Sequence, residues 1–263
     1  MDYFEKISKN PYADLYWNIP EEQKQGTVAV IGGNGQSFRT PVQVAEYLGK
    51  TFSVKEVKTV LPDSLKSKLP GFDNLVFLGS TESGSFANGE ELAQAIEGVD
   101  FALLVGDFSK NTITAGAIKS ALETSAKNAL ITRDTLDLLI GAGLESVLMR
   151  ENLTIMGSVA QWQKALRAIY YPKMLMMSQS LVQVAEVFHK FTLSYTVQVV
   201  SLHDGQILLA KNGKVVAVPL AESGYTPLTV WSGELAAKVL ALNMYNPDQF
   251  IEASVAAIYH KNS

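Results

Sequence analysis

The sequence contains no cysteine and only three histidines among its 263 residues. The absence of cysteine excludes disulfide bonds, thiolate metal sites and cysteine nucleophiles, and it suits a reducing compartment. The histidines are His189, His203 and His260, and their wide spacing forms no metal-ligand motif. We therefore expect no zinc site and name no metal ligand in this sequence.

Long apolar segments and basic clusters are also missing. No stretch reaches the roughly 18 apolar residues that a membrane-spanning helix needs. The first residues, MDYFEKISKN, carry acids and lysines where a signal peptide needs an apolar core. Lys and Arg are spread along a chain whose net charge is −4, which argues against binding to nucleic acid. We expect a cytoplasmic protein that has neither a membrane nor a nucleic acid as its partner.

The composition is that of a chain with one large core. Hydrophobic residues make up 47% of the sequence, and we find no linker, repeat or low-complexity stretch. A chain of this length lies at the upper end of single-domain size. We therefore expect a single domain over residues 1–263.

From Thr27 onward, short β-branched apolar runs alternate with longer amphipathic stretches, which is typical of βαβ units. The predicted strands are Thr27–Ile31, Val54–Val60, Leu75–Leu78, Phe101–Val105, Asn128–Ile131 and Leu153–Ile155. The predicted crossover helices are Thr40–Leu48, Glu90–Ile96, Ile113–Ser125, Asp134–Ile140 and Ser158–Leu166. Right-handed crossovers would give a mostly parallel sheet covered by helices on both faces, which is a three-layer α/β/α sandwich.

The pattern changes near the C-terminus. After a predicted helix over Leu181–Phe191, three further strands follow, with a hairpin turn at Lys211-Asn212-Gly213-Lys214. These strands are predicted at Tyr195–Val200, Gln206–Ala210 and Lys214–Val218. They indicate an antiparallel section after the parallel one. Two helices, Trp231–Leu242 and Asp248–His260, are expected to close the chain.

A glycine-rich turn, Gly32-Gly33-Asn34-Gly35, directly follows the first of these strands. Backbone N–H groups in such a turn can approach a phosphate, although a tight turn without any ligand uses glycine equally well. A dinucleotide-binding fingerprint would need a third glycine where Phe38 stands, which disfavours a Rossmann cofactor site. Thr40 is predicted to be the N-cap of the following helix, with Gln43 completing a capping box.

The most informative stretch is Trp231-Ser232-Gly233-Glu234, which opens an apolar helix. It resembles the signature of the ribokinase-like superfamily. There a Gly-x-Gly-Asp turn opens a helix whose N–H groups form an anion hole for the transferred phosphate, and the aspartate is the base on the substrate hydroxyl. Such a helix start concentrates unpaired donors and positive partial charge where phosphate charge moves.

The chain further resembles one family of this superfamily, the ADP/ATP-dependent NAD(P)H-hydrate dehydratases. The similar stretches occur in the family's order and together cover about residues 25 to 260. They are Val28–Asn34, Val99–Gly106, Leu130–Leu136 and Phe250–His260. The resemblance implies a ribokinase-like three-layer α/β/α sandwich with a mostly parallel central sheet and an antiparallel section near the C-terminus.

The resemblance also implies an activity. In these enzymes, ATP or ADP with Mg²⁺ phosphorylates the hydroxyl of hydrated NADH or NADPH, and loss of phosphate restores the dihydronicotinamide ring. Glu234 would be the base, and Ser232 and Gly233 would line the anion hole. The substrate would be bordered by Gly33, Asn34 and Asp134. Similar enzymes often self-assemble, so we expect a homo-oligomer.

Several positions depart from the family pattern. Glu234 replaces aspartate, and the extra methylene shifts the carboxylate by roughly 1 Å, which can cost about a hundredfold in rate. Trp231 replaces a small residue, and Gly106-Asp107-Phe108-Ser109-Lys110 lacks the family's later glycines. The family's Leu-Lys-Gly is also missing, and His203 is predicted to replace its lysine at the nucleotide.

Three functions therefore stay open at the level of the sequence. The first is a nucleotide-dependent dehydratase acting on hydrated NAD(P)H. The second is a catalytically impaired homologue that binds a nucleotide or dinucleotide and has a regulatory or scaffolding role, which the lost glycines and lysine favour. The third is a small-molecule or carbohydrate kinase, ranked lowest because it would still need an aspartate at position 234.

Overall fold

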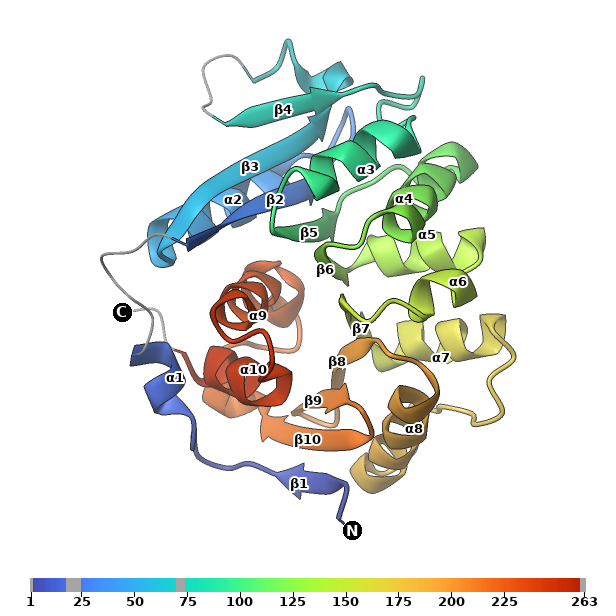
Figure 1. Ribbon diagram of the computed structural model, residues 1–263. Coiled ribbons are helices and arrows are strands. Elements are labelled where there is room, and N and C mark those ends of the chain that lie inside the picture. Colours follow the sequence, from blue (N-terminus) through green and yellow to red (C-terminus); the bar gives the residue numbers. More distant parts are fainter. Residues whose placement is uncertain (1, 18–24, 70–73, 261–263) are drawn as a thin grey trace.

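The computed structural model describes residues 2–17, 25–69 and 74–260. Within them, ten strands form one sheet in the order β1-β10-β9-β8-β7-β6-β5-β2-β3-β4 (Figure 1). The strands are β1 (Phe4–Lys6), β2 (Gln25–Gly32), β3 (Val54–Pro62), β4 (Leu75–Leu78), β5 (Phe101–Gly106), β6 (Asn128–Thr132), β7 (Leu153–Ser158), β8 (Gln198–His203), β9 (Gln206–Lys211) and β10 (Lys214–Pro219).

The α-helices alternate with these strands. They are α1 (Ala13–Trp17), α2 (Arg39–Thr51), α3 (Gly89–Glu97), α4 (Thr112–Thr124), α5 (Asp134–Ala142), α6 (Glu145–Leu148), α7 (Val159–Ala168), α8 (Leu181–Ser194), α9 (Glu234–Tyr245) and α10 (Phe250–Tyr259). Short 3-10 helices are η1 (Asp63–Leu65), η2 (Leu220–Ser223) and η3 (Thr229–Trp231).

The sheet is mostly parallel, as the sequence predicts. Strands β2 to β8 run parallel to one another, and β9 pairs antiparallel with both β8 and β10. The β9–β10 hairpin turns at Asn212-Gly213, where the sequence places its turn. The predicted antiparallel section near the C-terminus is therefore confirmed.

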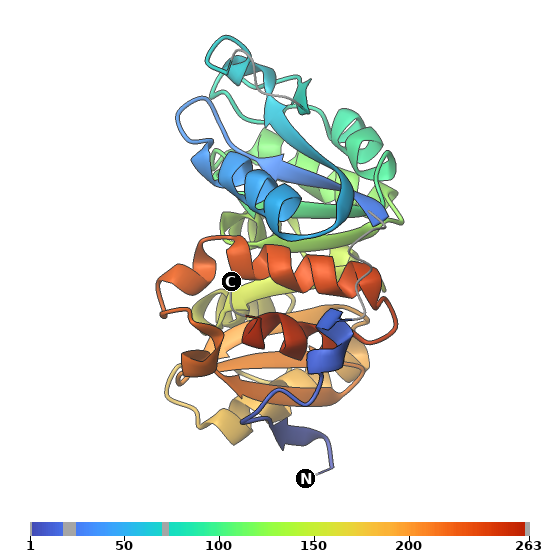
Figure 2. The same cartoon turned by 90° about the vertical axis from the view of Figure 1, so that its left-hand side faces the viewer.

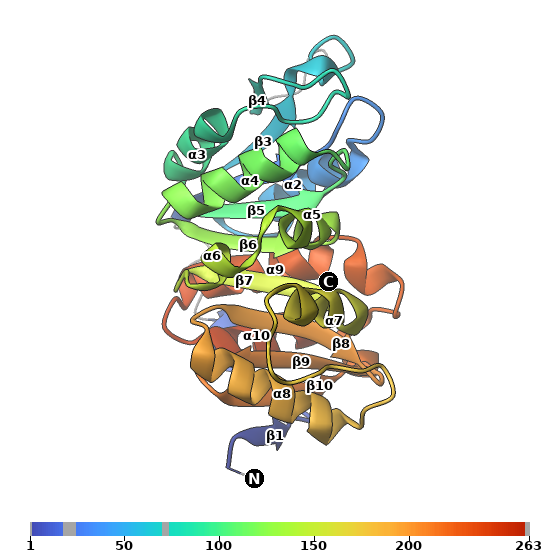
Figure 3. The same ribbon diagram turned by 90° about the vertical axis from the view of Figure 1, so that its right-hand side faces the viewer.

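Two separate cores lie on the two faces of the sheet. Helices α3 to α8 cover one face (Figure 3). Trp162, Phe188 and Phe191 are fully buried there. Helices α2, α9 and α10 cover the other face (Figure 2), and Phe250 is buried there among aliphatic side chains. The interior strands read as continuous apolar runs because both of their faces are covered.

Some local predictions are wrong. Helix α2 begins at Arg39 after Phe38, and no side chain caps it, so the predicted capping box at Thr40 does not form. Strand β8 begins at Gln198, because Tyr195 still terminates helix α8. The N-terminal elements β1 and α1 were not expected from the pattern, because they are short and lack a clear apolar period. Throughout the described part of the chain, every helix falls short of the length or apolar character needed to cross a membrane.

Candidate functional site

The order of the strands reverses between β2 and β5. From β2 the chain adds β3 and then β4 on one side, and later returns to place β5 on the other side. Ligands of open α/β sheets bind at the carboxyl ends of strands at such a switch point. Here the two loops contact each other, because Gly33 N donates to Gly106 O at 3.0 Å and Asn34 Nδ2 donates to Asp107 O at 2.6 Å. Two predicted substrate residues, Gly33 and Asn34, therefore lie at the switch point.

Asp134, the third predicted substrate residue, begins helix α5 beside this switch point. Its carboxylate accepts two backbone N–H groups, from Asp107 at 3.0 Å and from Phe108 at 2.9 Å. Burial raises the pKa of the Asp134 carboxyl, and these two N–H groups oppose the rise. Gly106 has φ +87°, and a Cβ there would overlap Oδ1 of Asp134. The carboxylate thus holds the loop that follows β5 in place.

Arg133 is a site residue that the sequence did not reveal. It has φ +58°, which is uncommon for a residue other than glycine. Its guanidinium forms an ion pair with Asp107, with 2.8 Å between Nη2 and Oδ1, and donates to Oγ1 of Thr40 at 2.8 Å. The hydroxyl of Thr40 is therefore engaged with a residue far away in the sequence. Arg133 connects the ends of β5 and β6 to the start of α2.

The start of α9 lies against the start of α2. Gly233, its N-cap, has φ +101°, and a Cβ there would lie 2.6 Å from Cγ2 of Val44 and 3.7 Å from Cγ2 of Thr40. Only glycine fits this turn without displacing α2. Glu234 N–H donates to Oγ of Ser232 at 3.4 Å, whereas the N–H groups of Leu235 and Ala236 have no partner among the described residues. These two N–H groups and the positive partial charge of the helix start are therefore available to a ligand. Ser232 and Gly233, for which the resemblance implies an anion hole, both lie at this helix start.

Beside this helix start lies a cleft of about 430 Å³, which we call the α9 cleft. Its lining consists mostly of polar residues from the loop before α9, the first two turns of α9 and the end of α10. They are Ser223, Gly224, Tyr225, Thr229, Ser232, Glu234, Lys238 and His260. The predicted base, Glu234, and the predicted anion-hole residue, Ser232, therefore line one cavity.

The electrostatics of the α9 cleft centre on Lys238, one turn after Glu234. Its amine donates to the backbone O of His260 at 2.7 Å and lies 5.1 Å from the centroid of the Tyr225 ring. Burial lowers the pKa of Lys238, and the Glu234 carboxylate opposes this change. Burial also lowers the pKa of His260, to about 4, with a further contribution from Lys238. Burial raises the pKa of Tyr225.

His203, the predicted substitute for the family's lysine, lies elsewhere. It ends β8 with 6% of its surface exposed, and its Nε2 is 2.7 Å from the backbone O of Gln179. It does not line the α9 cleft, whereas Ser232 and Glu234 do. The switch-point residues form a separate cluster, which Thr40 connects to Gly233.

Sequence reasoning missed Lys238 although a signal was present. The run from Leu235 to Leu242 is buried and, Lys238 apart, entirely apolar. A charged residue inside such a run is rarely buried without a specific partner. The sequence contained no comparable indication for Arg133, because its partners Asp107 and Thr40 come close to it only in the tertiary fold.

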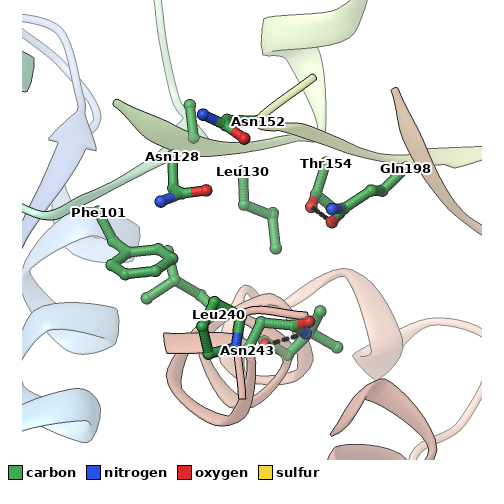
Figure 4. Close-up of a pocket in the computed structure, with 11 residues that line it drawn as sticks. Phe101, Asn128, Leu130, Asn152, Thr154, Gln198, Leu240 and Asn243 are labelled. Atoms are coloured by element: carbon green, nitrogen blue, oxygen red, sulfur yellow. Dashed lines mark hydrogen bonds between the residues drawn. The ribbon is translucent and has the colours of Figure 1, made fainter. Parts of the chain in front are cut away.

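A second cavity lies at the opposite edge of the sheet, where β5 to β8 begin (Figure 4). Asn128, Asn152 and Asn243 are among the residues that line it, and Thr154 Oγ1 donates to Gln198 Oε1 at 2.7 Å. Its volume of about 30 Å³ is far below the 300–1,000 Å³ typical of ligand sites. This cavity is therefore too small for a nucleotide.

An open groove of about 530 Å³ between α4 and α5 is larger. It is lined mainly by small and charged side chains, among them Lys110, Asp137 and Lys164. Asp134 connects it to the switch point. Ser232 and Glu234, which the resemblance assigns to phosphate chemistry, however, lie in the α9 cleft on the other face of the sheet.

The sequence matches no known family model and no curated protein. Solved structures place the fold in the ribokinase-like class, and a ribokinase-like superfamily protein from Enterococcus faecalis aligns with a TM-score of 0.68 at 15% identity, over 98% of this chain and 86% of that chain. The ADP/ATP-dependent NAD(P)H-hydrate dehydratase from Bacillus subtilis, co-crystallised with ATP and Mg²⁺, aligns with a TM-score of 0.62 at 12% identity, over 96% and 86%.

A kinase has the same fold. Bacillus subtilis pyridoxal kinase, solved as an ADP complex, aligns with a TM-score of 0.55 at 15% identity, over 89% of each chain. At such low identities the likeness establishes the fold alone. The ribokinase-like sandwich predicted from the sequence is thus confirmed, and the chemistry must be argued from the site.

Proposed function

We propose that this protein is a nucleotide-dependent enzyme that dehydrates hydrated NADH or NADPH, with ATP or ADP and Mg²⁺ bound at the start of α9. The observation that carries the proposal is the Gly233-Glu234 turn. It leaves the first turn of α9 uncapped and places a carboxylate in the α9 cleft. An uncapped helix start binds phosphate, and the carboxylate beside it accepts the proton of the attacking hydroxyl.

The chain's own groups have separate tasks in this reaction. Glu234 takes the proton as the substrate hydroxyl forms its bond to the terminal phosphorus of ATP or ADP, whose bond to the bridging oxygen breaks. The N–H groups of the first turn of α9 stabilise the charge that develops on the phosphoryl oxygens. The phosphate ester then loses phosphate together with a proton from the neighbouring carbon, which restores the double bond of the ring.

Mg²⁺ would neutralise the phosphate charge. Among residues 2–17, 25–69 and 74–260, no three His, Asp or Glu side chains are grouped so that they could hold a metal ion by themselves. This fits Mg²⁺, which in nucleotide sites is held by one or two carboxylates together with phosphate oxygens. Since Glu234, the carboxylate that lines the α9 cleft, is assigned to the proton transfer, Mg²⁺ would be held mainly by the phosphate oxygens.

The test is recovery of NADH absorbance from hydrated NADH in the presence of ATP or ADP and Mg²⁺. Glu234→Gln should lower the rate at least about a hundredfold, because the amide cannot accept the proton. Glu90→Gln is the matched control, since Glu90 is also an acid in the first turn of a helix, α3, on the other face of the sheet. Equal rates for the wild type and Glu234→Gln would refute the assignment.

A second candidate is a nucleotide-binding protein without turnover. The observation that favours it is the closed switch point, where both oxygens of Asp134 accept loop N–H groups and Arg133 pairs with Asp107. Each oxygen of the carboxylate predicted to border the substrate thus already accepts one hydrogen bond from the protein. Binding of ATP or ADP without any recovery of NADH would support this candidate over the enzyme.

A further inference from the structure

Lys238 is a buried cation whose partners do not balance its charge. Only 2% of its surface is exposed, and its neighbours along α9 are apolar. Its amine has three N–H donors, of which one donates to the backbone O of His260. The ring of Tyr225 lies near the amine as a weaker partner.

No carboxylate among the described residues forms an ion pair with Lys238. Even Glu234, four residues earlier on the same face of α9, is not within ion-pair distance. Buried lysines are normally paired, because an isolated buried charge costs several kcal/mol. The Lys238 amine therefore has N–H donors without a hydrogen-bond partner in the described part of the chain, in a buried place where unsatisfied donors lower the stability of the fold.

The unused donors lie at the α9 cleft, which Lys238 and Tyr225 both line. The Tyr225 hydroxyl is buried and has no hydrogen-bond partner among the described residues. Lys238 lies one turn after Glu234 on α9, and both residues line the cleft at the start of this helix. An ammonium group, a phenol hydroxyl and the open N–H groups of a helix start thus border one cavity.

We propose that Lys238 binds the phosphate chain of a nucleoside diphosphate or triphosphate in the α9 cleft, and so fills the role that the sequence had assigned to His203. The Tyr225 hydroxyl donates a second hydrogen bond to the same anion. This assignment rests on the proposed nucleotide-dependent function. A phosphate oxygen would satisfy the spare donors of Lys238 at the place where α9 already favours negative charge.

The experiment compares the binding of ADP with Mg²⁺ and the binding of adenosine by calorimetry. Lys238→Met should weaken ADP binding about ten- to hundredfold, because one charge-assisted hydrogen bond is lost, and should leave adenosine binding unchanged. Lys50→Met, which removes an exposed lysine on α2, is the control and should change neither affinity. Tyr225→Phe should weaken ADP binding by a smaller factor.

The stability of Lys238→Met provides a second readout that separates binding from structure. Without ligand, its midpoint of thermal unfolding should equal or exceed that of the wild type, because methionine fills a similar volume without the buried charge. A lower midpoint together with unchanged ADP affinity would show a purely structural lysine and overturn the assignment.

The two proposals can fail separately. If the wild type binds ADP and Lys238→Met binds it equally well, the role of Lys238 is wrong while nucleotide binding stands. If the wild type binds no ADP, both proposals are wrong.

Discussion

The guanidinium of Arg133 and the carboxylate of Asp107 form an ion pair of 2.8 Å that spans the carboxyl ends of β6 and β5. The side chains are 28% and 11% exposed, so the pair is shielded from water on most sides. Arg133 also donates to Thr40, at the start of α2. One side chain therefore fixes three segments around the switch point, and its own positive φ is held in place by these contacts.

Arg133→Met should lower the free energy of unfolding by about 1–3 kcal/mol, because Asp107 would keep its burial and lose its partner. Urea denaturation measures the change. A double-mutant cycle with Asp107→Asn should give a coupling energy of about 0.5–3 kcal/mol. Additive effects of the two substitutions would show that the pair contributes nothing to stability.

Asp134→Asn should destabilise the fold by about 1–3 kcal/mol, because an amide N–H₂ group would replace one of the two oxygens that accept the N–H groups of Asp107 and Phe108. Asp248→Asn, at an exposed position before α10, is the matched control and should change stability by less than about 0.5 kcal/mol. Equal urea midpoints for the two variants would contradict the structural role of Asp134.

Two glycine substitutions should have opposite effects on stability. Gly233→Ala would place a Cβ 2.6 Å from Cγ2 of Val44, at a residue with φ +101°. It should lower the free energy of unfolding by at least about 1 kcal/mol. It should also weaken nucleotide binding. Gly116→Ala, inside α4 with nothing within 4 Å, should stabilise the protein by about 0.4–1 kcal/mol. Thermal unfolding with and without ADP measures both effects. A stabilised Gly233→Ala variant would be incompatible with the described turn.

The low pKa of His260, about 4 against a usual 6.5, predicts how stability depends on pH. Between these values the folded protein keeps His260 neutral while the unfolded chain binds a proton, so His260 makes stability fall as the pH falls from 6.5 toward 4. An NMR titration should give a midpoint near 4 for His260, and Lys238→Met should raise it by removing a nearby positive charge. A midpoint near 6.5 in the wild type would contradict the burial described here.

The parallel core was predictable because its signal is local. Strands such as Phe101–Gly106 are continuous apolar runs, and the predicted ends of the parallel strands β2 to β7 differ from the observed ends by at most three residues. The capping box at Thr40 failed for the opposite reason. Its hydroxyl is engaged by Arg133, which is 93 residues away in the sequence and reaches it only through the tertiary fold. Propensity and spacing do not encode such a contact.

The candidate site also has a part that the sequence could predict and a part that it could not. The Gly233-Glu234 turn was found through its resemblance to the ribokinase-like signature, whose residues are adjacent in the sequence. The helix that follows it begins at Glu234 and not at the predicted Trp231, which lies in the 3-10 helix η3. The role predicted for His203 had no such local support, since the antiparallel pairing of β8 and β9 decides where its ring lies. Lys238 reaches the α9 cleft because α10 ends beside the start of α9, which only the tertiary packing of the two helices reveals.

The central claim is that the start of α9 binds a nucleotide, and thermal unfolding of the wild type with ATP or ADP tests it most directly. A ligand that binds only the folded state raises the midpoint. We predict a rise with ATP or ADP that is larger when Mg²⁺ is present and is lost in Gly233→Ala. An unchanged midpoint with both nucleotides, with and without Mg²⁺, would show that the protein has the ribokinase-like fold without its nucleotide site.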